Sequence, residues 1–332
     1  MVKALWLKLS ILFVTCASAA WADNVDTYAG LEFFGSTRIN RAALERLINL
    51  RSDANAQRIE AAAARLQNHF EHDHVSANIE VVSVGADQLA LVVDVPDPLS
   101  SIVTRRLNRP HRVRVTSEKP FLILADLHSR LDQLEQDGRP AREEWRDGYK
   151  FYSDEAANQM IEAIQQFLPS MRNELLDTVD CDPDPVRRAQ SIELLEWAAE
   201  PNDTAMNMLA AFDDVDLHVR AECAKYFYAR LDQLAEDFPY DALVQGLSRM
   251  LSRPTHQDRS KSLYCLLKLC QLHTQVVPLA KSLCERKVGD LSKQSILPTI
   301  KQPADKLLAI FATAPRYATP QDQPNQNQDS SF

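Results

Sequence analysis

The sequence predicts an α+β protein in which a small β-α-α-β-β domain precedes an α-solenoid of stacked helical hairpins. Residues 26–98 combine strand-like and helix-like hydrophobic patterns, whereas residues 125–314 carry almost only helical ones. Within the second region, two stretches resemble each other, which is typical of stacked repeats. With 332 residues, 45% hydrophobic and 25% charged, the chain has the composition of a globular protein with room for two or three domains.

Residues 1–22 are expected to be a secretory signal peptide. An apolar run, residues 9–16, is too short to cross a bilayer, and Ala20-Trp21-Ala22 forms an A-x-A cleavage site ahead of a polar stretch. A retained anchor or lipid attachment at Cys16 fits these residues less well. Cleavage would place the protein in the periplasm of a Gram-negative-type envelope. It would also change the net charge from −9 to −11, so nucleic acid is not an expected partner.

The predicted domain at residues 26–98 begins with a short strand. Leu31 and Phe33 alternate in it, and Gly35 ends it at a turn where we expect a side chain to be poorly tolerated. Two helices follow, separated by the polar break RSDANAQ. The first is predicted from Leu44, Leu47 and Ile48, and the second from the apolar stripe Ile59, Ala63, Leu66 and Phe70.

The same domain ends in two strands at residues 77–84 and 88–95. In the second strand, large apolar residues alternate with smaller or polar ones (Leu89, Leu91, Val93 and Val95 with Ala90, Val92 and Asp94). This period of two predicts a sheet with one buried face.

The stretches LEFFGSTRINRAALERLINL and HFEHDHVSANIEVVSVGADQLALVVDV resemble the opening and the closing half of a POTRA domain. The resemblance covers about a fifth of the chain. It implies a domain that recruits extended polypeptides by adding a strand to the edge of its sheet.

The solenoid is predicted from two copies of one pattern, DDVDLHVRAECAKYF at 213–227 and CDPDPVRRAQSIELL at 181–195. They superpose on the pairs Val186-Arg187 and Val219-Arg220, 33 residues apart. Four hairpins fit, at about residues 157–199, 202–236, 239–273 and 275–312.

This pattern is similar to that of HEAT and PBS-lyase-type HEAT-like repeats. Either Asp214 or Asp216 is expected to cap the helix that follows. The resemblance implies that Arg220 ties one repeat to the next. The signature residues are thus Asp214, Asp216, Val219 and Arg220, with Val186 and Arg187 in the earlier copy.

A basic connector, residues 99–124, joins the two regions, and its arginines include Arg105, Arg106, Arg112 and Arg114. These side chains form either a docking strip for anionic lipid head groups or an acidic protein, or a strand whose arginines lie against the acidic solenoid. Residues 315–332, rich in proline and polar residues, are expected to be a disordered tail.

The sequence offers little that predicts catalysis. Motifs of the GxGxxG, HExxH, GxSxG and CxxC types are absent, so no catalytic residue and no cofactor are expected. One metal-like cluster, His69, His72, Asp73 and His74, fits a solvated helix end better than a metal site. The five cysteines after Cys16 are expected to be buried and unpaired, with one disulfide as the alternative.

The function expected from these patterns is binding without catalysis. The protein would be a periplasmic adaptor or scaffold in envelope assembly, secretion or division, with protein partners and peripheral contact with anionic lipid. The alternative is a hydrolase or lyase whose site lies in the solenoid groove. A convergent set of His, Asp and Glu in that groove would favour the enzyme.

Overall fold

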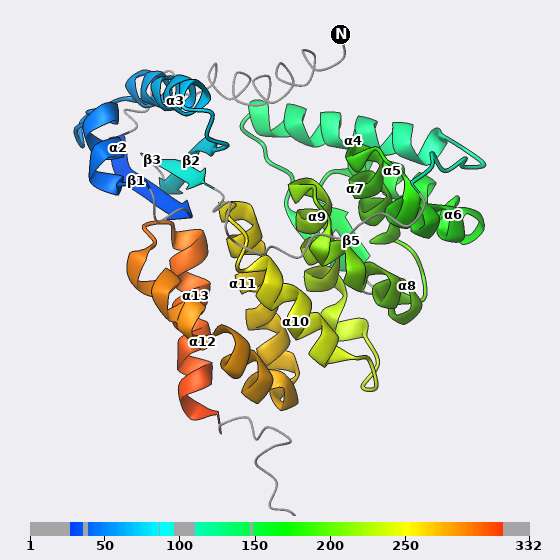
Figure 1. Ribbon diagram of the computed structural model, residues 1–332. Coiled ribbons are helices and arrows are strands. Elements are labelled where there is room, and N and C mark those ends of the chain that lie inside the picture. The colour runs from blue at the N-terminus through cyan, green and yellow to red at the C-terminus, as the bar shows by residue number, and fades with distance from the viewer. Residues whose placement is uncertain (1–26, 36–38, 86, 96–109, 147–148, 315–332) are drawn as a thin grey trace, which may run out of the picture.

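The computed structural model describes residues 27–35, 39–85, 87–95, 110–146 and 149–314. These residues form twelve α-helices, a three-stranded sheet and a two-stranded sheet. The larger sheet is built from the start of the chain, and most helices follow it in sequence (Figure 1). The chain is therefore a mixed α and β protein with a helical C-terminal region.

The three-stranded sheet has β3 (Gln88–Val95) at its centre. It pairs in parallel with β1 (Thr27–Gly35) and antiparallel with β2 (Asn78–Gly85). Helices α2 (Arg41–Ile48) and α3 (Ala56–His72) connect β1 to β2 and cover one face of the sheet. The order of elements is thus β-α-α-β-β.

Both helices begin at an asparagine cap. The side chain of Asn40 accepts a hydrogen bond from the backbone of Ala42, and that of Asn55 accepts one from Arg58. A side-chain oxygen at this position satisfies a backbone N–H that has no partner within the helix.

The sequence-based expectation of one buried face for this sheet is wrong. Leu91 and Val93 pack beneath α2 and α3, but Ala90 and Val92 on the other face are also fully buried and belong to the core of the helical region. Asp94 on that second face is 0% exposed. The central strand is therefore enclosed on both sides, because the helical region covers the face that was expected to meet solvent.

The helical region starts with α4 (Lys119–Gln136), so the last residues of the stretch assigned to the connector are helical. A hairpin of β4 (Glu143–Arg146) and β5 (Tyr149–Tyr152) follows, within a region that was expected to be almost all helix. The remaining helices are α5 (Glu155–Gln165), α6 (Leu168–Cys181), α7 (Pro185–Leu195), α8 (Pro201–Met208), α9 (Leu217–Arg230), α10 (Tyr240–Met250), α11 (His256–Leu272), α12 (Val277–Gln294) and α13 (Pro298–Thr313).

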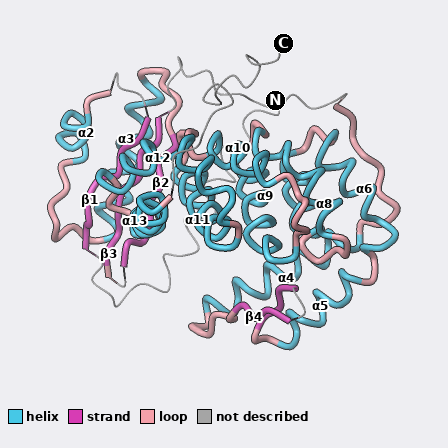
Figure 2. The backbone as a smooth tube through the Cα atoms, turned by 90° about the horizontal axis from the view of Figure 1, so that it is seen from below, coloured by secondary structure: helices cyan, strands magenta, loops and turns pink. Residues whose placement is uncertain are grey.

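These helices pack in two layers. Helices α4, α7, α9, α11 and α13 lie side by side in one layer, each in contact with the next, while α6, α8, α10 and α12 form the other. Both views show the three-stranded sheet beside α12 and α13, and Glu32 on β1 bonds to Ser295 and Ile296 between these helices, so the sheet packs on the last helix pair (Figures 1 and 2).

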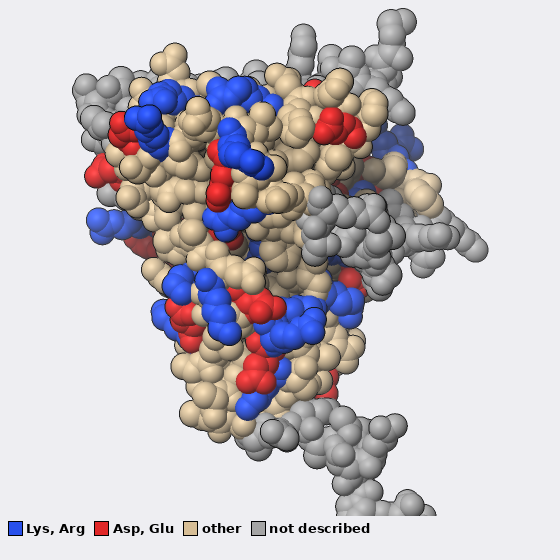
Figure 3. Space-filling model, turned by 60° about the vertical axis from the view of Figure 1, so that its left-hand side comes forward, with Lys and Arg blue, Asp and Glu red and all other residues tan. Residues whose placement is uncertain are grey.

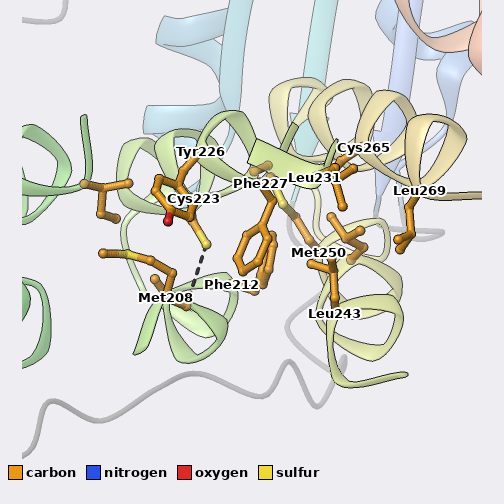
Figure 4. Close-up of a cluster of buried hydrophobic side chains, with 14 of the residues drawn as sticks. Met208, Phe212, Cys223, Tyr226, Phe227, Leu231, Leu243, Met250, Cys265 and Leu269 are labelled. Atoms are coloured by element: carbon orange, nitrogen blue, oxygen red, sulfur yellow. Dashed lines mark hydrogen bonds between the residues drawn. The ribbon is translucent and has the colours of Figure 1, made fainter. Parts of the chain in front are cut away.

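The core between the layers is made of interlocking aromatic and aliphatic side chains (Figure 4). The rings of Phe212 and Phe227 stack with centroids 5.3 Å apart, and Tyr226 meets Phe227 edge to face. A Cβ on Gly246 would lie 2.8 Å from the Phe212 ring, so this glycine lets α10 approach closely. The apolar stripe of each helix pair is thus buried by its neighbours.

Within the described part of the chain, no disulfide joins the five cysteines after Cys16. Cys181 is half-buried, and Cys223, Cys265, Cys270 and Cys284 are buried. The thiol of Cys223 donates to the carbonyl of Met208 at 3.3 Å. Among the residues that the structure describes, no helix combines the length and the apolar character needed to cross a bilayer.

Candidate functional site

Buried arginines connect successive helix pairs. Arg188 on α7 makes two hydrogen bonds to the carboxylate of Asp214, at 2.7 and 3.0 Å, and a third to the carbonyl of Asp182. Arg220 on α9 repeats this arrangement with the carboxylate of Asp258, at 2.6 and 2.8 Å, and with the carbonyl of Asp214. Each guanidinium therefore ties its own turn to the next helix pair through bidentate, charge-assisted bonds.

A third arginine extends this series to the sheet. Arg259 on α11 donates to the carboxylate of Asp94 on β3 at 2.9 Å, and the backbone N–H of His256 donates to the same carboxylate at 2.7 Å. We call the three pairs Arg188–Asp214, Arg220–Asp258 and Arg259–Asp94 the arginine ladder. Its last carboxylate comes from the sheet rather than from another helix.

A second buried carboxylate fastens the sheet to the helices. Glu32 on β1 is 5% exposed and accepts hydrogen bonds from the Ser295 hydroxyl at 2.8 Å and from the backbone of Ile296 at 2.9 Å. Gly30 lies close to Ile296 as well, since a Cβ there would be 3.2 Å from its side chain. Two buried carboxylates on the same face of the sheet, Asp94 and Glu32, thus bind the helical region.

No strand that the structure describes pairs with the outer edge of β2. In the described part of the chain, its backbone bonds to β3 on one side, and the one additional hydrogen bond to it comes from its own residue Ser83, whose hydroxyl donates to Gly85. By contrast, the outer edge of β1 is partly occupied, because Tyr28 donates to the carbonyl of Ser52 and Arg41 donates to the carbonyl of Leu31. The edge of β2 offers an eight-residue row of backbone groups to an added strand.

Glu80 and His256 connect this open edge to the ladder. Glu80 lies on β2, and its carboxylate is 3.6 Å from the Nδ1 atom of His256 at the start of α11. Nδ1 is buried without a hydrogen bond and lies 3.8 Å from the Asp94 carboxylate. Only β2 would therefore separate an added strand from β3, which carries Asp94 of the last ladder pair.

Of the repeat residues expected from the sequence, Asp214 and Arg220 belong to the ladder, and the alignment of the two copies shifts by one residue. Asp216 caps α9, accepting from the backbone of His218 and Val219, while Asp214 accepts from Arg188. The position equivalent to Arg220 is held by Arg188, 32 residues earlier, and not by Arg187.

Arg187 has a different environment from Arg220. It bonds to the carboxylate of Glu118 at 2.7 and 2.8 Å and stacks over the Phe121 ring at 4.1 Å, which fastens α4 to α7. Val219 is buried in the core, whereas Val186 is 50% exposed.

Gly35 lies at the end of β1 with φ of +117°. A Cβ there would lie 1.8 Å from the carbonyl oxygen of Val95, the last residue of β3. The position therefore excludes a side chain both by its backbone conformation and by its contact with the neighbouring strand.

The described part of the basic connector runs along α6. The backbone of Val113 donates to the carboxylate of Asp182, and that of Thr116 donates to Glu174 at 2.7 Å. Val113 is buried, while Arg112 and Arg114 are exposed and make no ion pair with a described residue. Their side chains thus point away from the helices; Arg105 and Arg106 lie outside the described residues.

The sequence did not predict a cluster of buried charges around Lys150. Lys150 on β5 is 2% exposed, lies 3.2 Å from the carboxylate of Glu196 and approaches the Trp197 ring. Burial disfavours its charged form, but the Glu196 carboxylate outweighs this and raises the pKa of Lys150. A lysine in a four-residue strand reads as a surface residue, so no sequence signal marks this ion pair.

Next to this pair, His128 on α4 contacts Glu193 on α7 at 2.9 Å, and Lys225 on α9 lies 3.7 Å from the same carboxylate. Burial alone would raise the pKa of Glu193, but the hydrogen bond with His128 and the charge of Lys225 lower it to about 2. The hydrogen bond to Glu193 raises the pKa of His128. Each carboxylate here faces a cation, an arrangement that holds the β4–β5 hairpin and α4 on the helix layer.

The histidines at the end of α3 do not converge. His69 lies 3.7 Å from Asp73 with both side chains close to half exposed, and His74 has a positive φ of 56° in the following turn. No group of three His, Cys, Asp or Glu residues in the described part of the chain is arranged to hold a metal ion.

Neither protein-family models nor the sequences of curated proteins match this chain at a significant level. The function of the chain is therefore inferred from its own residues and their contacts.

Proposed function

We propose that this protein is a non-enzymatic periplasmic adaptor that holds extended polypeptides by adding them as a fourth strand to the edge of β2. The observation that carries this proposal is that the outer edge of Asn78–Gly85 is paired with no described strand, whereas helices cover both faces of the sheet. An added strand gains main-chain hydrogen bonds along the edge, and side-chain pockets on the two sides give selectivity.

Two further features support this assignment. The β-α-α-β-β order with a mixed three-stranded sheet is the order expected of a POTRA-like domain, and the ladder-linked helix pairs fit HEAT-like stacking. The sequence of residues 1–22 supports export, and roles in envelope assembly, secretion or division agree with a scaffold of this design.

The charge on one face of the protein favours a protein partner there over a broad electrostatic surface for lipid. Lys and Arg lie beside Asp and Glu on the face that contains α12 and α13, as in the pair Lys301–Asp305, rather than forming a patch of one sign (Figure 3). The exposed Arg112 and Arg114 remain candidates for peripheral contact with anionic lipid.

The test is a selection of extended peptides from a displayed random library on the full chain. Two edge variants, Val81→Pro and Val82→Pro, are then compared, because adjacent residues of a strand direct their N–H groups to opposite edges. One proline removes an N–H from the open edge and leaves the pairing with β3 intact, whereas the other breaks that pairing. A thermal melt distinguishes the two variants, because the one that breaks the pairing with β3 should unfold at the lower temperature.

We expect the better-folded proline variant to lose peptide binding, while Val81→Ala and Val82→Ala, which keep their N–H groups, retain it. Selected peptides that bind equally well to the wild type and to this proline variant would refute strand addition at β2.

A further inference from the structure

The edge strand β2 carries one acidic side chain among apolar ones. On the face toward the helical region, Glu80 alternates with Val82 and Val84, and both valines are half-buried against the core of that region. On the face toward α2 and α3, Ile79 and Val81 are half-buried as well. A strand added to β2 would therefore meet apolar side chains on both faces of the sheet and a carboxylate at one position.

Glu80 lies where a residue of an added strand can reach it. It is the cross-strand partner of Val92 on β3, so its side chain lies on the same face of the sheet as Val92. Residues directly opposite each other on neighbouring strands have Cβ atoms about 4.5–5.5 Å apart. The Glu80 side chain is 31% exposed, so part of it is accessible beside the position that a fourth strand would occupy.

Among the described residues, no lysine or arginine forms an ion pair with Glu80. One carboxylate oxygen accepts a hydrogen bond from the side chain of Asn78 at 2.6 Å. The other lies 3.6 Å from Nδ1 of His256, beyond hydrogen-bond distance. By contrast, Asp94 on the same face is paired with Arg259. A basic side chain on the added strand would give Glu80 the partner that Asp94 already has.

The carboxylate of Glu80 also disfavours other strands. Like charges directly opposite each other on neighbouring strands are destabilising, and a charged residue on an edge strand discourages pairing with a second copy of that strand. The chain as a whole has a net charge of −9, which attracts a basic segment and repels an acidic one. An apolar strand with one basic residue is therefore complementary to this edge.

We propose that Glu80 determines which polypeptides this edge takes, a proposal that rests on strand addition at β2. Glu80 selects extended, mostly apolar segments that place a lysine or an arginine opposite its carboxylate. Alternate residues of a strand share a face, so the residue of the added strand that lies opposite Val82 on this face is expected to be apolar.

Selection from a displayed random peptide library on the full chain tests the proposal. On the wild type, one position of the selected peptides should be enriched in lysine or arginine, with apolar residues around it. On Glu80→Lys, the same position should instead be enriched in aspartate or glutamate, because the charge that it faces is reversed. This comparison requires no assumption about the direction or the register of the added strand.

Isothermal titration then measures the preference with one selected peptide and an analogue in which glutamate replaces the basic residue. We expect the wild type to bind the basic peptide about tenfold more tightly, because one peptide forms an opposite-charge pair with Glu80 and the other a like-charge pair. In Glu80→Gln, which keeps the shape of the side chain, this preference should fall to about twofold or less. This variant carries the test if Glu80→Lys does not fold.

The matched control is Asp87→Asn. Asp87 is an exposed residue between β2 and β3, and its substitution removes the same charge from the same hairpin while keeping the backbone carbonyl that accepts from Thr27. The control should retain the tenfold preference, since Asp87 lies beyond the end of β2.

Three results would overturn the proposal. Peptides that lose binding in the better-folded proline variant, but bind equally well with either charge, would exclude selection by Glu80 and leave strand addition in place. A selection that yields no peptide, or peptides that bind this proline variant as well as the wild type, would overturn strand addition and the role of Glu80 together. A wild-type dimer in sedimentation that the same proline variant abolishes would assign the edge to a second copy of β2.

Discussion

The carboxylate of Asp94 on the central strand accepts a hydrogen bond from the guanidinium of Arg259 at 2.9 Å, although 165 residues separate the two in sequence. Both side chains are 0% exposed. Arg188 and Arg220 donate to carboxylates on the next turn or helix, but Arg259 donates to a carboxylate on the sheet. The sheet therefore takes the place of a further helix pair at the end of the ladder, and the two regions share one core.

Replacing Asp94 by alanine should lower the free energy of unfolding of the full chain by about 3–5 kcal/mol, because it leaves the Arg259 charge buried and unpaired. The double variant Asp94→Leu, Arg259→Met, which removes both charges, should recover most of this loss. Urea melts followed by circular dichroism measure both. A loss below 1 kcal/mol in Asp94→Ala would mean that the pair does not hold the sheet to the helices.

Arg220 should behave in the same way within the helical region. Arg220→Ala leaves Asp258 buried without its bidentate partner, and we expect a loss of about 3–5 kcal/mol in the same melts. The control is Arg139→Ala, since Arg139 is 70% exposed and its ion pair with Asp137 lies at the surface, where such pairs contribute little. Equal effects of the two substitutions would contradict the role of Arg220 in the ladder.

Of the three ladder arginines, the sequence pattern predicted only Arg220, whose position follows from a short local motif. Asp184 and Asp216 each cap a helix, and in both copies the ladder arginine comes four residues after the cap. Alignment on the Val-Arg pairs selected Arg187, whereas the distance from the cap selects its neighbour Arg188. The cap-to-arginine spacing was therefore the more reliable signal.

The burial of Asp94 and of Lys150 could not be predicted from the residues near them in sequence. Asp94 reads as a solvent-facing residue of an alternating strand, because its partner Arg259 is remote in sequence. Lys150 reads as a surface residue of a short polar segment, and its burial depends on Glu196 and Trp197 from a later helix end. Both side chains are buried because they pair with an opposite charge that is distant in sequence, which local patterns do not reveal.

Gly35→Ala should destabilise the protein by about 1 kcal/mol or more, because its φ of +117° and its approach to the Val95 carbonyl both exclude a Cβ. Gly85→Ala is the matched control, since a Cβ there meets no atom within 4 Å. Thermal unfolding of the two full-length variants compares them. A Gly35→Ala melt that coincides with the Gly85→Ala melt would show that the turn accepts a side chain.

The His128–Glu193 pair should make stability depend on pH in two directions. The pKa of His128 is raised from 6.5, so its contribution is complete below about pH 6.5 and is lost as the pH rises through the raised value. The pKa of Glu193 is lowered from 4.5 to about 2, so its contribution is complete above about pH 4.5 and is lost as the pH falls toward 2.

The pair is therefore strongest between about pH 4.5 and 6.5. The difference in unfolding free energy between the wild type and His128→Gln should be largest in this interval and should shrink as the pH rises through the raised pKa of His128. A difference that stays constant from pH 5.5 to pH 9 would show that the imidazole charge has no part in the contact.

Reversal of the exposed connector arginines, Arg112→Glu with Arg114→Glu, should leave the melting temperature nearly unchanged, since neither side chain has an ion pair with a described residue. Binding of the full chain to vesicles that contain anionic phospholipid should weaken, and wild-type binding should fade as salt is added. A marked drop in melting temperature would instead show that these arginines are paired within the protein.

We expect the outer edge of β2 to accept an extended polypeptide. Hydrogen–deuterium exchange of the full chain, with and without a library-selected peptide, measures this most directly, because an added strand protects the outward amides of the edge that it covers. We expect new protection within Asn78–Gly85 when the peptide is bound. Protection confined to the helices, with exchange of the β2 amides unchanged, would contradict it.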